Sequence, residues 1–324
     1  MTKVRTSMST QHSDQFDDIT VTRVIEWAGQ IKTVTEILPD ASPADWQANR
    51  SLLTPHFWDP ETDAYLCHIQ TWVIRTADRT ILVDTGVGND RDRPQIPPFA
   101  HLHTDFLDRL AAVGVAPDEV DTVINTHIHY DHVGWNTMLR NGSFVPTFPN
   151  ATYLVPQADY DYFHPDNAHL MRAPETEDER LRFAGIRLVF DDSIAPLEQT
   201  GQLRLWHDHL DLPDLPISLE AAPGHTPGSS LVRLRSSQGG AMFVGDLLHS
   251  PMQLLHPEFR CSFDLDPVQA EHTRRDVLAR ASKQGAIILP AHLPGHSGAR
   301  IAQTAGDHAY DIAAWAGFPV RDDA

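Results

Sequence analysis

The sequence predicts an α/β fold in which strands and helices mix within one domain. Short apolar and β-branched runs, bounded by Gly, Pro, Asn or Asp, recur along most of the chain and are typical of strands. Stretches with helical apolar spacing separate several of these runs. No fixed-period repeat or low-complexity linker divides the 324 residues, and 41% hydrophobic residues suffice for one large buried core.

The first half of the chain supplies neighbouring strands of a sheet. Ala64–Arg75 and Thr80–Asp84 are β-rich runs, and Thr-Gly closes the second of them. The apolar spacing of 103–113 predicts a helix, and Val120–Thr126 returns to a buried strand. The histidine-rich segment after residue 126 therefore begins where a strand ends, which is where a rigid scaffold usually presents functional groups.

The second half of the chain repeats this pattern. Helices are expected at Pro267–Lys283 and Ala299–Trp315, with a strand at Ala286–Leu289 between them. The segment 157–214 is charged and irregular, with a helix near 176–184, and is predicted to be a cap insertion over the core, with a plain surface excursion as the alternative. The remaining strands are expected at Ala151–Val155, Gln202–Trp206, Ile217–Ala222, Ser230–Arg235 and Ala241–Val244.

The N-terminus and the net charge argue against several functions. Residues 1–18 are polar and lack the apolar core of a signal peptide, so we expect a flexible lead-in, a single domain at 19–324 and a cytoplasmic protein. No run is long enough to span a membrane. The net charge of -19 repels nucleic acid. Cys67 and Cys261 lack C-x-x-C spacing and are expected to be reduced thiols.

A dense group of metal-ligand residue types lies at 127–132. His127 and His129 are two positions apart, so in an extended backbone both imidazoles point to the same side and can bind one cation. Asp131 and His132 follow, where the chain turns, and add an oxygen and a nitrogen ligand. Such a density of ligand residues predicts a metal site.

Three later segments share one form, a strand that ends in a Gly or Pro turn with one ligand-type residue. These residues are His225, Asp246 and His292. Each segment alone is weak, because a single His or Asp beside Gly is usually a turn residue. Together with 127–132 they supply enough imidazoles and carboxylates to hold two divalent cations with open positions for water.

This ordered set resembles the metallo-β-lactamase superfamily, which is identified by H-x-H-x-D-H followed by a distant His, an Asp and a last His. The resemblance covers about 80–292. It implies an αβ/βα sandwich of two mixed sheets flanked by helices. It also implies the ligand sets, which are His127, His129 and His225 for the first metal, Asp131, His132 and His292 for the second, and Asp246 as the bridge.

Two further residues gain a role from the same resemblance. Asp84, in Leu-Val-Asp-Thr-Gly, matches a position whose carboxylate supports the metal-binding loop through hydrogen bonds. His249 lies three residues after Asp246, where homoserine lactonases often have a tyrosine that binds the substrate carbonyl. We expect His249 either to donate a hydrogen bond to the reacting oxygen or to pack at a strand end.

Several apolar residues are expected to line a pocket for a small-molecule substrate. The candidates are Phe57 and Trp58 in an early loop, Trp135 just past the metal motif, and Met252–Leu255. An exposed aromatic loop at Phe57 and Trp58 would also permit a homodimer. The segment 157–214 would then cover the site.

The resemblance implies that the chemistry is hydrolysis. The spacing of His225, Asp246 and His292 is similar to that in the branch of N-acyl homoserine lactonases and methyl parathion hydrolases. We predict a dinuclear hydrolase of a lactone, aryl ester or phosphotriester, with a metal-bridging hydroxide as nucleophile and Asp131 or Asp246 transferring its proton. Zn²⁺ is expected first, and Fe, Mn or Co tolerate the same ligands. The alternatives are a homoserine lactonase proper and a non-catalytic small-ligand-binding module of the same fold.

Overall fold

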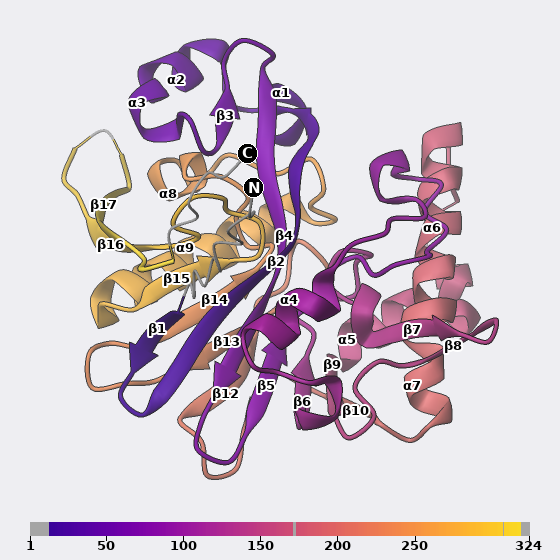
Figure 1. Ribbon diagram of the computed structural model, residues 1–324. Helices are drawn as coiled ribbons and strands as arrows, with labels where there is room; N and C mark the ends of the chain where they lie inside the picture. The colour runs from indigo at the N-terminus through magenta and orange to yellow at the C-terminus, as the bar shows by residue number, and fades with distance from the viewer. Residues whose placement is uncertain (1–12, 171–172, 307, 319–324) are drawn as a thin grey trace, which may run out of the picture.

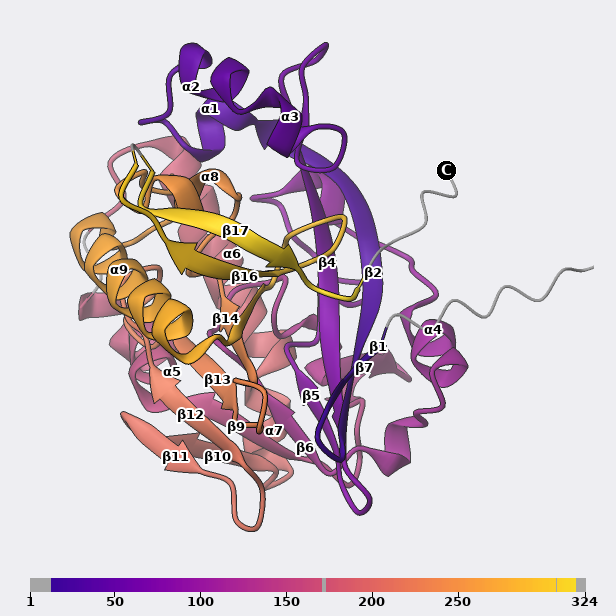
Figure 2. The ribbon, with the colours of Figure 1, turned by 90° about the vertical axis from the view of Figure 1, so that its left-hand side faces the viewer.

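Two mixed β-sheets lie face to face with helices on their outer sides (Figure 1). The structure is a computed structural model that describes residues 13–170, 173–306 and 308–318. In the view of Figure 2, helix α9 (Pro267–Gln284) and strands β16 (Ala299–Gln303) and β17 (Tyr310–Trp315) lie toward the viewer. This arrangement confirms the αβ/βα sandwich expected from the sequence.

The first sheet joins an antiparallel part to a parallel part. β1, β2, β4 and β5 pair antiparallel, whereas β5, β6, β9 and β10 run parallel. Parallel pairing requires long crossover connections, and these carry several of the helices. The strands in spatial order are β1 (Ser13–Phe16), β2 (Ile19–Thr33), β4 (Ala64–Arg75), β5 (Thr80–Val83), β6 (Thr122–Ile124), β9 (Thr152–Pro156) and β10 (Leu203–Trp206), and β3 (Trp58–Asp59) pairs with β4.

The second sheet is antiparallel except where β14 runs parallel to β15. A separate hairpin of β7 (Thr137–Arg140) and β8 (Ser143–Pro146) follows the histidine-rich segment. The strands of the second sheet in spatial order are β11 (His209–Asp211), β12 (Ile217–Ala221), β13 (Ser230–Leu234), β14 (Ala241–Gly245), β15 (Ile287–Pro290), β16 and β17.

Alternation of side chains along the strands builds three buried layers. Trp72 of β4 and Phe243 of β14 point into the space between the sheets, where their rings pack edge to face. Their neighbours Val73 and Met242 point to the outer faces and pack under helices. Because both faces of these strands are buried, the runs are almost continuously apolar, as is usual for central strands.

Two helices cover the outer faces of the sheets. α4 (Phe106–Ala112) packs on the first sheet through Phe106 and Leu110. α9 packs on the second sheet through Val277 and Leu278. It begins at Asp266, whose side chain accepts from the Gln269 N–H, and ends at Gly285 in the left-handed conformation. The remaining short helices are α1 (Val34–Ile37), α2 (Pro43–Ala48), α3 (Arg50–Leu53), α8 (Met252–Leu255), η1 (Pro97–Phe99), η2 (Pro117–Glu119) and η3 (Gly134–Asn136).

The segment predicted as a cap contains both helices and strands. Its helices, α5 (Gln157–Phe163), η4 (Pro165–Leu170), α6 (Glu177–Ser193) and α7 (Ala195–Gln199), connect β9 to β10. Its last part forms β10 and β11, so these residues belong to the two sheets rather than to an insertion. Asp192 at the end of α6 accepts two hydrogen bonds from the buried guanidinium of Arg93, which anchors the helix to the loop after β5.

Two sequence predictions are wrong in detail. Ala299–Trp315 is not a helix but the antiparallel pair β16 and β17, because β15 offers an unpaired backbone edge and Ala299 and Ile301 bury alternate side chains beside it. Ser13–Phe16, expected within the flexible lead-in, pairs with β2. The rest of that lead-in, 1–12, lies outside the described residues.

Within the described ranges, no helix has the length and apolar character needed to cross a bilayer.

Candidate metal centre

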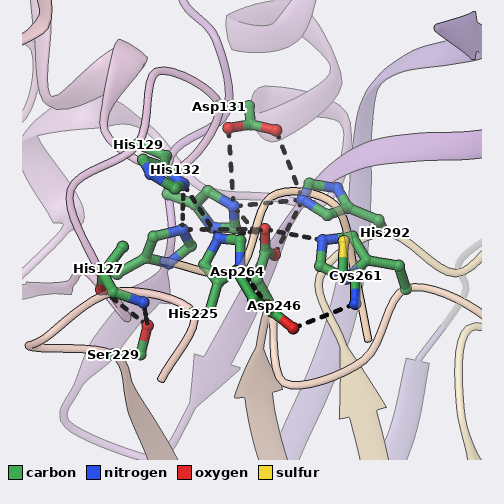
Figure 3. A network of polar contacts seen from close by, with 12 residues as sticks. His127, His129, Asp131, His132, His225, Ser229, Asp246, Cys261, Asp264 and His292 are labelled. Atoms are coloured by element: carbon green, nitrogen blue, oxygen red, sulfur yellow. Dashed lines mark hydrogen bonds and ion pairs between the residues drawn. The ribbon is translucent and has the colours of Figure 1, made fainter. Parts of the chain in front are cut away.

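The candidate ligands lie on loops at one edge of the sandwich. The segment 127–132 follows β6, Asp246 follows β14, and His292 follows β15. His225 lies in the turn between β12 and β13. The structure thus brings together ligands that are far apart in the sequence, and their side chains point toward one another (Figure 3).

Three imidazoles form the first cluster. The Nδ1 atom of His129 lies 3.1 Å from Nε2 of His127 and 3.0 Å from Nε2 of His225. Nitrogens that share a tetrahedral zinc ion lie about 3.3 Å apart, given Zn–N bonds of about 2.0–2.1 Å. Burial and neighbouring imidazoles hold the pKa of His127 and of His129 well below the usual value, which favours the neutral form that binds metals.

The second cluster contains two imidazoles and one carboxylate. The Nε2 atoms of His132 and His292 lie 3.2 Å apart, and Oδ2 of Asp131 lies 3.4 Å from Nε2 of His292. Asp131 is only 9% exposed, and His132 is fully buried. Buried carboxylates and imidazoles of this kind are normally paired or coordinate a metal.

The carboxylate of Asp246 lies between the two clusters. Its Oδ2 atom lies 3.3 Å from Nε2 of His225, and its Oδ1 atom lies 3.0 Å from Nε2 of His292. Oδ1 is buried and accepts no hydrogen bond from any residue that the structure describes. A carboxylate that bridged two cations would use both of its oxygens as ligands. This would explain why Oδ1 faces imidazole nitrogens without a hydrogen bond, so the donor set fits a pair of divalent ions.

Asp84 supports both clusters from behind. Nδ1 of His132 donates to Oδ2 of Asp84 at 2.8 Å. The hydroxyl of Thr126 donates to the same carboxylate and lies 3.1 Å from Nδ1 of His127. These contacts leave both Nε2 atoms free to bind a cation, as the sequence analysis expected of Asp84.

Two other supporting residues were missed by the sequence analysis. Asp264 accepts a hydrogen bond from Nδ1 of His225 at 3.1 Å, and the backbone carbonyl of His68 accepts one from Nδ1 of His292 at 3.0 Å. Asp264 lies 39 residues from His225 and belongs to no recognisable motif. A backbone carbonyl is available at every position, so His68 carries no signal in the sequence either.

His249 is buried beside the two clusters of candidate ligands. Its Nε2 atom lies 3.2 Å from Oδ2 of Asp246. Its backbone is fixed on both sides, because the Tyr65 hydroxyl donates to its carbonyl and Gln253 accepts from its N–H. The structure therefore brings this residue to the candidate site, with its imidazole facing Asp246.

The residues expected to line a pocket lie in the protein core instead. Phe57, Trp58 and Met252–Leu255 are buried among apolar side chains outside the second sheet. Trp135 packs on Phe106 and donates its indole N–H to Glu26. Because Phe57 and Trp58 are each 3% exposed, they do not form the exposed aromatic loop that was expected to permit a dimer.

Other aromatic side chains contact the site directly. The ring of Phe163 lies 5.9 Å from that of His129, and Phe263 lies 6.2 Å from His249. Neither residue was among the candidates predicted from the sequence. They lie on α5 and on the loop before α9, which only the fold brings next to the histidines.

Comparisons of sequence identify relatives among lactonases. The N-acyl homoserine lactonase AttM of Azorhizobium caulinodans is 30% identical over 195 residues, which is 57% of this chain and 63% of that protein. AttM of Agrobacterium fabrum is 31% identical over 137 residues, or 41% of this chain and 43% of that protein. The chain therefore matches less than two thirds of the length of each.

Solved structures share the fold over almost the whole chain. The hydrolase AbOPH of the β-lactamase superfamily has a TM-score of 0.76 at 23% identity, over 98% of this chain and 99% of that one. AidC, a dizinc quorum-quenching lactonase in complex with the product N-hexanoyl-L-homoserine, has a TM-score of 0.70 at 18% identity. The match covers 94% of this chain and 97% of that one. A sequence model of the metallo-β-lactamase superfamily matches residues 64–292. The chain therefore belongs to the metallo-β-lactamase superfamily.

Proposed function

We propose that the protein is a dinuclear metal-dependent hydrolase that acts on a small ester-type substrate. The observation that carries this proposal is the position of Asp246, whose two carboxylate oxygens face separate clusters of ligands. A single-metal site would need only one of the two clusters. The second candidate function, a non-catalytic binding module, is not favoured by any feature of the site.

The proposed ligand sets follow the two clusters. His127, His129 and His225 would hold the first cation, and Asp131, His132 and His292 the second, with Asp246 shared. We propose Zn²⁺, which imidazole and carboxylate ligands suit and which AidC contains, although Fe, Mn or Co accept the same donors. Two such cations would supply an activated water and an electrophile for the oxygen of the bond to be cut.

The carboxylates and His249 would handle protons and the reacting oxygen. Asp131 belongs to the second cluster and Asp246 lies between the two clusters, and either would accept the proton of the attacking water and return it to the leaving oxygen. The Nε2 atom of His249 faces the bridging position, 3.2 Å from Oδ2 of Asp246. We propose that the imidazole of His249 donates to the substrate oxygen in the bound complex.

The proposed substrates are lactones first, then aryl esters and phosphotriesters. Lactones lead because the sequence relatives are N-acyl homoserine lactonases and because AidC is a lactonase that binds N-hexanoyl-L-homoserine. Phe163 and Phe263 would contact the apolar part of such a molecule. The net charge of -19 opposes polyanionic substrates.

Metal analysis combined with a substrate panel tests the proposal. We expect about two equivalents of Zn²⁺ in the purified protein, hydrolysis of at least one lactone, aryl ester or phosphotriester, and loss of activity with chelator. Asp246→Ala should lose both metal and activity. His209→Ala, on an exposed edge strand, is the matched control and should keep both. Full hydrolysis by the metal-free protein would contradict the proposal.

A further inference from the structure

Asp159, in the first turn of α5, lies between two loops that carry metal ligands. Its side chain is fully buried and belongs to neither cluster. Oδ2 accepts from the Ile128 N–H at 2.8 Å and from the Thr226 hydroxyl at 3.0 Å. Oδ1 accepts from the Gly228 N–H at 2.6 Å. One carboxylate thus joins the loop after β6 to the loop between β12 and β13.

The partners of Asp159 are immediate neighbours of ligands. Ile128 stands between His127 and His129, and Thr226 follows His225. All three imidazoles of the first cluster therefore come from the two backbone segments that this carboxylate holds together. A change in the distance between those segments would change the spacing of the nitrogens that a cation must bridge.

The contact at Gly228 shows how close the second loop comes to α5. A Cβ atom built on Gly228 would lie 2.4 Å from the backbone nitrogen of Asp159 and 2.8 Å from its Cβ. Any larger residue would push the loop away from the helix. Ser229 reinforces the turn, because its hydroxyl accepts from the Thr226 N–H at 2.9 Å.

Among the described residues, no lysine or arginine forms an ion pair with Asp159. Burial raises its pKa to about 6, and the three donors act in the opposite direction. A buried carboxylate without a basic partner is unfavourable for stability unless every lone pair it presents is used. Its presence here is therefore better explained by the arrangement that it maintains than by a contribution to stability.

The second cluster is held by other groups. His132 donates to Asp84, and His292 donates to the carbonyl of His68. Among the described contacts of Asp159, none involves Asp131, His132 or His292. Different residues therefore hold the two clusters in place, and Asp159 contacts only the loops that carry the first cluster.

We propose that Asp159 is a positioning residue that sets the spacing of His127, His129 and His225 and thereby controls metal affinity at the first cluster only. This inference rests on the proposed function, because it requires that the clusters bind metal. Removal of an outer hydrogen-bond partner typically weakens metal affinity about 10- to 100-fold. We expect an effect of this size at the first cluster and none at the second.

Variants that lack a ligand of one cluster allow Zn²⁺ binding at the other cluster to be measured alone. His292→Ala removes a ligand of the second cluster, and His225→Ala removes one of the first. The dissociation constant for Zn²⁺ is then measured by chelator competition with and without Asp159→Asn. We expect about 10- to 100-fold weaker binding in the His292→Ala background and unchanged binding in the His225→Ala background. Equal weakening in both backgrounds, or none in either, would overturn the inference.

Matched variants guard against a general loss of structure. Asp161→Asn, on the exposed side of the same helix, should leave Zn²⁺ affinity unchanged. Thr226→Val removes only one of the three hydrogen bonds to Asp159 and should weaken the same site to a smaller extent, so it tests the idea if Asp159→Asn does not fold. If the wild-type protein binds no Zn²⁺, the proposed function fails. If it binds Zn²⁺ and neither variant weakens the first cluster, only the inference fails.

Discussion

Nδ1 of His132 lies 2.8 Å from Oδ2 of Asp84, and both side chains are buried. Asp84 also accepts the hydroxyl proton of Thr126, whose oxygen lies beside Nδ1 of His127. One carboxylate thus fixes the ring orientation of a histidine in each cluster. Asp84 has φ 57°, a left-handed conformation that the turn after β5 imposes and that Asp tolerates better than most residues.

Asp84→Asn is expected to weaken Zn²⁺ binding at both clusters, by about 10- to 100-fold each. An amide can donate as well as accept, so it no longer holds His132 and Thr126 in a single arrangement. Chelator competition in the His292→Ala and His225→Ala backgrounds would measure the two sites separately. Asp78→Asn, an exposed change, is the control. Weakening at one cluster alone would contradict this prediction.

His249→Ala is expected to lower kcat about 100-fold while Zn²⁺ content stays unchanged. Its imidazole is proposed to donate to the reacting oxygen, and loss of one such donor typically has an effect of this size. His249→Gln retains an N–H donor and should recover part of the rate. Steady-state kinetics with parallel metal analysis would check both variants. Loss of metal in His249→Ala would instead assign the residue a role in the cluster.

The contribution of Asp159 to the stability of the metal-free protein is expected to fall as the pH rises from about 4 to about 6. Burial raises the folded-state pKa of Asp159 from 3.8 to about 6, so the folded state binds a proton more tightly than the unfolded state does. The stabilisation is complete below pH 3.8 and is lost as the pH rises through the folded pKa. Its full size is of order 3 kcal/mol, since one pKa unit corresponds to about 1.4 kcal/mol.

Urea unfolding in chelator would measure this pH effect. The difference in unfolding free energy between the wild type and Asp159→Asn isolates the contribution of Asp159, because the histidine ligands are common to both proteins. If the unfolding free energies of the two proteins change with pH in the same way between pH 4 and 6.5, Asp159 does not titrate in this range, which would contradict the prediction.

Phe243→Ala is expected to lower the unfolding free energy by about 3–5 kcal/mol. The ring fills the space between the two sheets and is 1% exposed, so its loss leaves a cavity that the strands cannot close. Leu139→Ala, where the side chain is 44% exposed, should change stability by less than about 0.5 kcal/mol. Denaturant titration of the three proteins gives the comparison, and a small effect at Phe243 would contradict this account of the core.

Most strands could be predicted from the sequence because strong local signals mark them. β4, β5, β14 and β15 are apolar runs, and their observed bounds agree closely with the expected ones. The pair β16 and β17 could not be predicted in this way. Their Ala-rich sequences favour a helix, and only the unpaired edge of β15 decides for strands.

The candidate ligands could be identified from the sequence, whereas their supporting residues could not. The identity and short spacing of His127, His129, Asp131 and His132 are local properties, so they are legible without a fold. The roles of Phe57 and Trp58 could not be predicted in this way. Nothing in the local sequence distinguishes an aromatic residue that lines a pocket from one in the core, where these two residues lie.

The sequence by itself determined which side chains are candidate metal ligands and where most strands of the two-sheet sandwich lie. Only the tertiary structure decided that Asp246 faces both clusters, that Asp264 holds His225, and that Asp159 joins the two loops of the first cluster. The physical reason is separation along the chain. Asp159 lies 31 residues from Ile128 and 67 from Thr226, and a carboxylate at such a distance becomes a hydrogen-bond partner only when packing of the sheets and helices brings the three segments together.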